Sequence, residues 1–251
     1  MSAATHPWPP PRRDPLRLLL SPAPWAALAY LGSYLVVGTV LFTQVVIVVV
    51  TAASLSFTLT LAGIPLLVAA AVVVRGCAQV ERVRSGLVIP GPVQSAYLPV
   101  TRPGVMAQLR TRWRDPATRR DLAYVVFMYV PLLLMDTVVF GLWLSFLAGI
   151  TLPLWYWSTP QTFDNGQVAH GVALGYLPNG PDGPGGFGWW IGSLPSALLA
   201  AAVFLVLLLL GNYLVVLAAG VHGRIARALL GPFSDPLADA KQVLASPGPL
   251  G

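Results

Sequence analysis

Few side chains in this sequence could perform chemistry, and Asp136 is the most distinctive of them. It lies near the middle of the apolar stretch 122–152, where an ionised carboxylate costs on the order of 2.5 to 3.5 kcal/mol on membrane-insertion scales. Two interpretations stay open: a protonated aspartate that locks helices together, or a switch that responds to a proton or a ligand. Asp136→Asn separates them, because a structural acid tolerates the isostere whereas a switch loses its response.

No combination of residues typical of an enzyme accompanies this acid. The sequence contains neither an HExxH metal motif nor a GxSxG nucleophile motif. Its single cysteine, Cys77, excludes an intramolecular disulfide and a cysteine-rich metal site. The glycine-rich run 180–188 lacks the lysine of a phosphate-binding loop and predicts a flexible loop. We therefore expect no enzymatic activity, no catalytic residue, no cofactor and no metal.

The segment 153–193 is a second candidate site, for sensing outside the membrane. It is longer than two antiparallel helices need, and long loops are often functional. The aromatic residues at its two ends are equally typical of the belts that flank a membrane. The spacing of its acids and histidine matches no metal-ligand motif. The candidate sensing residues are Trp155, Trp157, Asp164, His170, Asp182, Trp189 and Trp190.

A third set of residues is basic and could bind the inner leaflet or a partner protein. Part of this set lies in a segment whose apolar residues recur at helical spacing, which is typical of a helix lying on a membrane surface. These apolar residues are Val105, Met106, Leu109 and Trp113. The candidate surface residues are Arg82, Arg84, Arg110, Trp113, Arg114, Arg224 and Arg227.

The elements that carry these residues follow from the distribution of charge. The chain is 56% hydrophobic and only 10% charged, and no charged side chain occurs between Arg17 and Arg75 or between Asp182 and Arg224. A water-soluble fold needs a charged face on nearly every element, so these uncharged stretches indicate segments that lie in a lipid bilayer. Since about 20 apolar residues cross a bilayer, we predict transmembrane helices near 26–50, 54–76, 120–152 and 194–221. The first turn is expected at 51–56, and the third helix is expected to tilt or to bend at Pro131.

The two halves of this sequence resemble each other. Ser-Pro-Ala at 21–23 and Leu-Ala-Tyr at 28–30 recur as Asp-Pro-Ala at 115–117 and Leu-Ala-Tyr at 122–124. We therefore predict an all-α, polytopic membrane protein whose four transmembrane helices form two similar helical hairpins. The predicted four-helix domain spans 25–233, with a cytoplasmic loop at 77–119 and an extracytoplasmic loop at 153–193. A cytoplasmic segment, 1–24, precedes it and a flexible cytoplasmic tail, 234–251, follows it.

The same offset between the halves suggests partners for the buried acid. It aligns Thr43 with Thr137, so Thr43 and Gln44 on the first helix are expected at the depth of Asp136. We predict an intramembrane polar site formed by Asp136, Thr137, Thr43 and Gln44. Small residues on the helices, such as Gly32 and Gly38, could permit close packing within the bundle or in a homodimer.

The basic residues predict the orientation. All 15 Lys and Arg residues lie in the segments 12–17, 75–120 and 224–241, and such residues accumulate on the cytoplasmic side. Both termini are therefore expected in the cytoplasm of a multi-pass cell-membrane protein. The net charge of +6 is then explained by topology and by the anionic inner leaflet of the lipid bilayer, and no nucleic-acid partner is expected because no binding motif accompanies the arginines.

Four motifs, in this order, resemble the actinobacterial putative sensor domain. They are Ala-Gly-Ile-Pro-Leu at 62–66, Arg-Asp-Pro-Ala-Thr at 114–118, Leu-Pro-Leu-Trp-Tyr-Trp at 152–157 and Arg-Ala-Leu-Leu-Gly-Pro at 227–232. The resemblance covers roughly residues 15 to 233 and implies a signal-receiving membrane module, without a shared ligand. Members commonly precede a histidine kinase, and free-standing copies occur. Here only a short tail follows Pro232, so a free-standing form is expected.

Two classes of function remain at this point. The first is a sensory or regulatory membrane module that relays a signal to a separate output protein, a kinase or a transcription regulator. The second is a small membrane subunit of a transporter whose ATPase is a separate chain. Transport favours a polar path through the helices, which offer little beyond Asp136, Gln44 and Asn212. The sequence therefore favours sensing.

Overall fold

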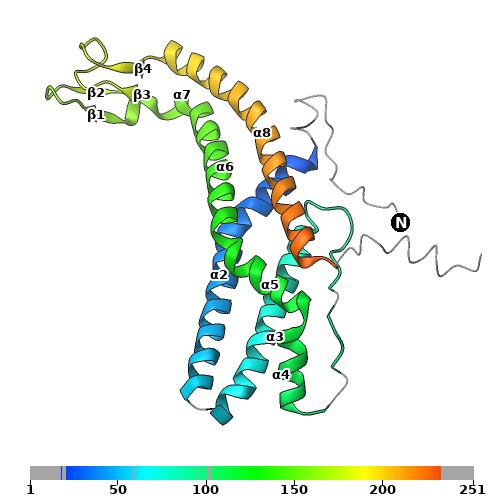
Figure 1. Cartoon of the computed structure of the whole chain (residues 1–251). Coiled ribbons are helices and arrows are strands. Elements are labelled where there is room, and N and C mark those ends of the chain that lie inside the picture. Colours follow the sequence, from blue (N-terminus) through cyan, green and yellow to red (C-terminus); the bar gives the residue numbers. More distant parts are fainter. Residues whose placement is uncertain (1–17, 19–20, 59, 96, 101–102, 233–251) are drawn as a thin grey trace, which may run out of the picture. The chain divides into compact units, whose positions relative to one another are not determined.

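The structure, a computed structural model, describes residues 18, 21–58, 60–95, 97–100 and 103–232, and helices dominate it (Figure 1). The helices are α2 (Pro22–Thr58), α3 (Thr60–Ser85), α4 (Val105–Arg114), α5 (Pro116–Phe127), α6 (Tyr129–Ile150), α7 (Leu152–Trp155) and α8 (Leu194–Leu230), with a 3₁₀ turn at Tyr156–Ser158. The predicted tail 234–251 and most of the segment 1–24 lie outside the described residues.

Four helices in the described part of the chain are long and apolar enough to cross a membrane. They are Pro22–Thr58, Gly63–Ser85, Tyr129–Ile150 and Leu194–Leu230, with mean hydropathies of 1.8 to 2.6. Each exceeds the roughly 20 residues that a bilayer requires. The predicted all-α, polytopic class with four transmembrane helices is therefore confirmed.

The first span extends further than predicted. α2 runs through the expected turn at 51–56 and ends at Thr58. The short polar side chains in this region bond to their own helix: Ser56 Oγ donates to Ala52 O at 2.6 Å and Thr58 Oγ1 to Ser54 O at 3.1 Å. Because these hydroxyl groups are satisfied within the helix, their polarity does not interrupt it.

The third predicted helix is two helices, and the break precedes Pro131. α5 begins at Pro116, with Asp115 as its N-cap accepting a hydrogen bond from Ala117 N, and it ends before Met128. α6 then begins at Tyr129. Pro131 thus lies in the first turn of α6, where a missing N–H costs nothing because that group has no partner within the helix.

The segment between α7 and α8 contains two small antiparallel β-sheets. β1 (Pro160–Thr162) pairs with β2 (Val168–His170), and β3 (Val172–Tyr176) pairs with β4 (Phe187–Ile191). Gly175 lies opposite Gly188, with φ values of 123° and 155° that favour glycine. Most of the run 180–188, which is expected to be a flexible loop, connects β3 to β4, and its last two residues begin β4. Asn179 Nδ2 donates to Pro184 O at 2.8 Å in this connection. The expected flexibility stays a prediction.

The chain forms two compact units. Unit 1 comprises residues up to Gly32 and Met135–Ala219, and unit 2 comprises Ser33–Leu134 and the residues from Gly220 onward. The boundary falls inside α2, α6 and α8. Unit 1 therefore contains both β-sheets, and unit 2 contains α3, α4, α5 and the last turns of α8.

Candidate functional site

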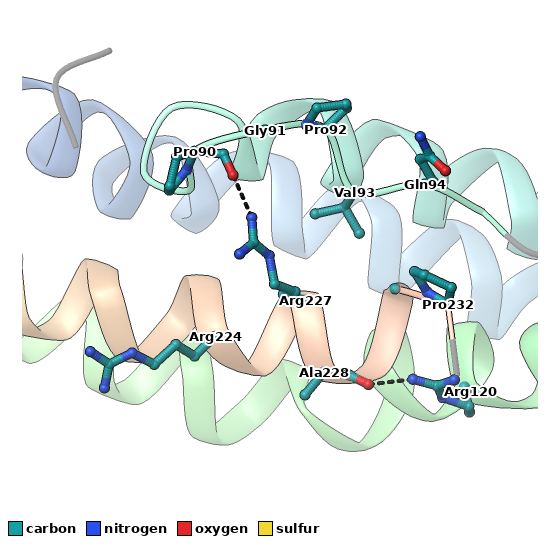
Figure 2. A pocket seen from close by; sticks show the side chains of 11 residues that line it. Pro90, Gly91, Pro92, Val93, Gln94, Arg120, Arg224, Arg227, Ala228 and Pro232 are labelled. Atoms are coloured by element: carbon teal, nitrogen blue, oxygen red, sulfur yellow. Dashed lines mark hydrogen bonds between the residues drawn. The ribbon is translucent and has the colours of Figure 1, made fainter. Parts of the chain in front are cut away.

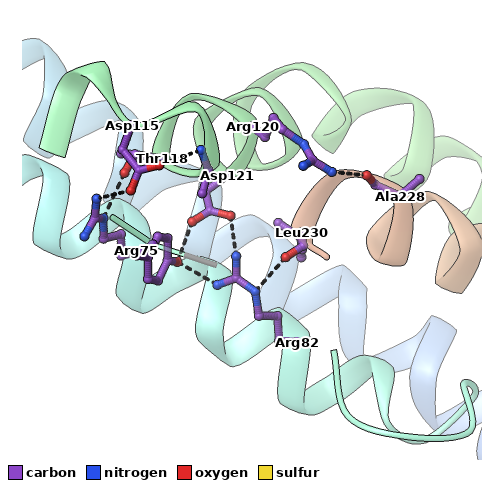
Figure 3. Close-up of polar contacts among 10 residues, drawn as sticks. Arg75, Arg82, Asp115, Thr118, Arg120, Asp121, Ala228 and Leu230 are labelled. Carbon is purple, nitrogen blue, oxygen red and sulfur yellow. Dashed lines mark hydrogen bonds and ion pairs between the residues drawn. The ribbon is translucent and has the colours of Figure 1, made fainter. Parts of the chain in front are cut away.

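Unit 2 contains a network of buried charged side chains centred on Arg82 of α3 (Figure 3). Arg82 Nη2 donates to Asp121 Oδ1 at 2.6 Å, Nη1 donates to Tyr97 Oη at 2.7 Å, and Nε donates to Leu230 O at 3.0 Å. Tyr97 in turn donates to Asp121 Oδ2 at 2.5 Å. The Arg82 and Asp121 side chains are only 2% and 1% exposed. This guanidinium therefore joins α3, α5, the 86–104 segment and the end of α8.

A second ion pair lies on the same side of α3. Arg75 Nη2 donates to Asp115 Oδ2 and Arg75 Nε donates to Thr118 Oγ1, both at 2.8 Å. Asp115 also accepts a hydrogen bond from the backbone N–H of Leu98. Arg75 and Arg82 are two helical turns apart, so they project from one face of α3 toward α5. Asp115 at the N-cap of α5 is also favourably placed for the helix dipole.

A third buried pair joins neighbouring residues of α3. Arg84 donates to both oxygens of Glu81, from Nε at 2.9 Å and from Nη2 at 3.0 Å, and its Nη1 donates to Ser33 Oγ at 2.6 Å. His222 Nε2 of α8 lies 3.7 Å from Glu81 Oε1 and 3.1 Å from Tyr124 Oη. Glu81 and His222 are fully buried. The bidentate geometry is the strong form of an arginine–carboxylate pair.

All described carboxylates of unit 2 take part in these pairs. Glu81, Asp115 and Asp121 each accept from an arginine of α3, namely Arg84, Arg75 and Arg82 respectively. Burying a charge is costly unless it is paired and hydrogen-bonded. The network meets that condition, and it leaves no described acid in unit 2 to neutralise a further arginine.

Burial changes the acid–base behaviour of the network. It raises the pKa of Tyr97 to about 12, and the hydrogen bond to Asp121 and the negative charge of Asp121 also raise this pKa. The hydrogen bond from Arg82 and its positive charge lower it. Burial also raises the pKa of Asp121 above its ordinary value, while the hydrogen bonds from Tyr97 and Arg82 oppose that shift. Both residues lie outside the four apolar spans.

We expect Tyr97 to ionise at a higher pH than an ordinary tyrosine, whose pKa is about 10. Because the folded-state pKa of about 12 exceeds the unfolded value, the contribution of Tyr97 to stability is fully present below pH ~10 and is lost as the pH rises through the folded pKa. The measurement is tyrosinate absorbance against pH for the wild type and Tyr97→Phe. The difference between the two curves should rise near pH 12; a rise near pH ~10 would contradict the predicted burial.

The structure corrects the predicted basic surface at two positions. Arg82 and Arg84 are not surface residues, because their side chains are 2% and 8% exposed and form the pairs described above. Trp113 donates from Nε1 to Leu67 O at 2.9 Å and so packs on α3. The other four predicted residues are exposed: Arg110, Arg114, Arg224 and Arg227.

The structure brings together only some of the predicted extracytoplasmic residues. Trp155 and Trp189 pack against the unit 1 core formed by Leu152, Ile191, Ala197 and Ala200. Trp190 contacts Phe163 edge-on at 5.5 Å between ring centroids, and Trp157 is 62% exposed. The three polar candidates are exposed: Asp164, His170 and Asp182. Within the described residues no three metal-ligating side chains form a group that could hold an ion.

The predicted intramembrane site is divided between the two units. Asp136 is fully buried, and Thr137 beside it is exposed. Both belong to unit 1, whereas Thr43 and Gln44 belong to unit 2 and are exposed. The predicted contact of Asp136 with Thr43 and Gln44 stays a prediction.

The four apolar helices and the buried polar network in unit 2 define a helical, multi-pass membrane protein. The chain belongs to the family described as "Putative sensor", whose model matches residues 30–230. The predicted resemblance to the putative sensor domain is thereby confirmed over most of the chain. Neither the curated proteins nor the solved structures contain a match.

Proposed function

We propose that this protein is a membrane-embedded sensory or regulatory module that performs no catalysis itself and relays a signal to a separate output protein. Its membership of the "Putative sensor" family supports a sensory role. The main support for a relay is the buried network of unit 2. In this network the guanidinium of Arg82 bonds to α5, to Tyr97 and to the last turn of α8.

Such a network suits a two-state element. Shifting the end of α8 would break the hydrogen bond from Arg82 to Leu230 O and that from Arg120 to Ala228 O. The buried Nε–H of Arg82 would then lack its acceptor, and an unsatisfied buried donor costs about 1–3 kcal/mol, so intermediate positions are disfavoured and the helix end moves between discrete arrangements. Repacking of salt bridges accompanies several known switching transitions.

We place the network on the cytoplasmic side. Lys and Arg residues accumulate there, and the basic residues of α3, α4, α5 and α8 all belong to the two segments 75–120 and 224–241. This orientation puts both termini in the cytoplasm, the anionic inner leaflet beside the exposed arginines, and the two β-sheets outside the cell. The signal then enters on the extracytoplasmic side or from the lipid phase.

The test is crosslinking in native membranes with a photoreactive residue at Arg110, which is exposed on α4. We expect a crosslink to a kinase or a transcription regulator. The matched control carries the same photoreactive residue at Trp157, which is also exposed but is placed on the opposite side by the proposal. A crosslink from Arg110 to an ATPase would support a transporter subunit instead. The absence of any crosslinked output protein, or one captured equally from both positions, would overturn the proposal.

A further inference from the structure

Unit 2 contains an open pocket of about 830 Å³ beside the buried network (Figure 2). Its walls are the Pro90–Gln94 segment, Arg120 of α5, and Arg224, Arg227 and Ala228 of α8, with Gly231 and Pro232 at one end. This volume is within the range of about 300–1,000 Å³ that is typical of small-molecule sites.

Three arginines and no acid line this pocket, and few of their donors bond to residues that the structure describes. Arg227 donates one N–H to Pro90 O at 2.6 Å, and Arg120 donates one to Ala228 O (Figure 2). Arg224 forms no hydrogen bond or ion pair with any described residue. A guanidinium has five N–H donors, so most of the donors at this pocket have no partner among the described residues.

No described acid of unit 2 is left to balance the charge of the pocket. The three described carboxylates of unit 2 are already paired with Arg75, Arg82 and Arg84 of α3, so three positive charges at the pocket are balanced only from outside the described chain. The planar guanidinium group matches phosphate geometry and is preferred where phosphate is recognised. We infer that this pocket binds a phosphate-bearing anion, either the headgroup of an anionic lipid or a free phosphate compound.

The pocket walls favour an anion that is only partly enclosed. Pro90 and Pro92 supply no backbone N–H, so the arginine side chains provide most of the donors at this pocket. Arg224 and Arg227 are exposed and can reach a ligand at the mouth, while Arg120 is half-buried. The inference concerns binding by unit 2 alone and does not depend on the proposed relay to a partner protein.

The experiment uses the purified full chain in detergent with three probes: phosphatidylglycerol, phosphatidylcholine and inorganic phosphate. Retained lipid is measured by native mass spectrometry and phosphate binding by calorimetry. The variants are Arg224→Gln and Arg224→Gln/Arg227→Gln. The first removes an exposed side chain that has no hydrogen bond or ion pair with any described residue, so we expect it to fold even if the double variant is unstable. The matched control, Arg110→Gln/Arg114→Gln, removes two exposed charges of α4 that do not line the pocket.

We expect binding of an anionic probe to fall about tenfold in the double variant, as for the loss of hydrogen bonds to charged groups, and to change less than about twofold in the control. Selective retention of phosphatidylglycerol over phosphatidylcholine identifies a lipid headgroup as the ligand, and binding of inorganic phosphate identifies a free phosphate compound. Either result supports the site. Equal losses in pocket variants and control, or no binding of any phosphate-bearing probe, would overturn it.

Discussion

Arg82→Met is expected to lower the free energy of unfolding by about 3–5 kcal/mol, the usual cost of removing one partner of a buried ion pair. Methionine keeps an unbranched apolar stem but has no guanidinium group, so Asp121 stays buried with only the hydroxyl of Tyr97 as a side-chain partner among the interactions described above. It also removes the donor to Leu230 O. Denaturant unfolding in mixed micelles, followed by tryptophan fluorescence, measures the loss.

A second substitution tests whether the loss comes from the unpaired charge. Arg82→Met/Asp121→Leu removes both partners, and replacing a buried pair by apolar residues is often neutral or stabilising, so most of the stability should return. The control is Arg119→Met, which removes an exposed arginine of α5 and should change stability by less than about 0.5 kcal/mol. A loss in Arg82→Met no greater than in the control would show that the pair does not form.

Gly149→Ala is expected to weaken the packing of α6 against α8 in unit 1. A Cβ atom at Gly149 would lie 2.2 Å from Cγ of Phe204, a separation that no side chain can adopt without movement of the ring or the helix. Overpacking of this kind costs about 1–3 kcal/mol or more. Thermal unfolding of the detergent-solubilised protein measures the effect.

The same helix supplies a matched control for this substitution. At Gly141, also on α6, a Cβ atom would meet nothing within 4 Å, so Gly141→Ala should be neutral or stabilising by up to about 1 kcal/mol because alanine favours a helix. Gly149→Ala/Phe204→Ala removes the ring that clashes and should be more stable than Gly149→Ala alone. If Gly149→Ala and Gly141→Ala behave alike, the close approach of the two helices is refuted.

Features that depend on short stretches of sequence were predictable. Long uncharged runs are enough to predict four apolar helices, because lipid requires about 20 apolar residues whatever the rest of the chain does. The start of α5 is also a local feature, since Asp115 caps the helix and Pro116 occupies its first position. The exact ends were less predictable, since Ser and Thr near 51–56 indicate a turn in sequence but bond to the preceding helical turn in the structure.

The buried network could not be predicted in the same way. Arginines close to an apolar span were interpreted as membrane-surface residues, which is their usual role, yet Arg82 pairs with an aspartate 39 residues away. Such a pair depends on how α3 meets α5, which local patterns do not encode. One signal was available: two arginines two turns apart on one helix, and two aspartates close together at the start of another.

The two β-sheets between α7 and α8 illustrate a different limit. Their strands have three to five residues, too short for alternation of apolar and polar residues to stand out, and their turns are rich in glycine and proline. The same composition is typical of flexible loops. The cross-strand pairing of Gly175 with Gly188 brings two backbones together, which composition alone does not reveal.

The pairing of each described carboxylate of unit 2 with an arginine of α3 has a consequence for ionic strength. Dissolved ions screen exposed charges over about 8 Å at physiological salt, but they screen buried pairs far less. The paired arginines of α3 are therefore largely insulated from the surrounding salt concentration, whereas the exposed Arg224 and Arg227 respond to it. One residue type thus provides both a salt-insensitive framework and a salt-sensitive surface within a single unit.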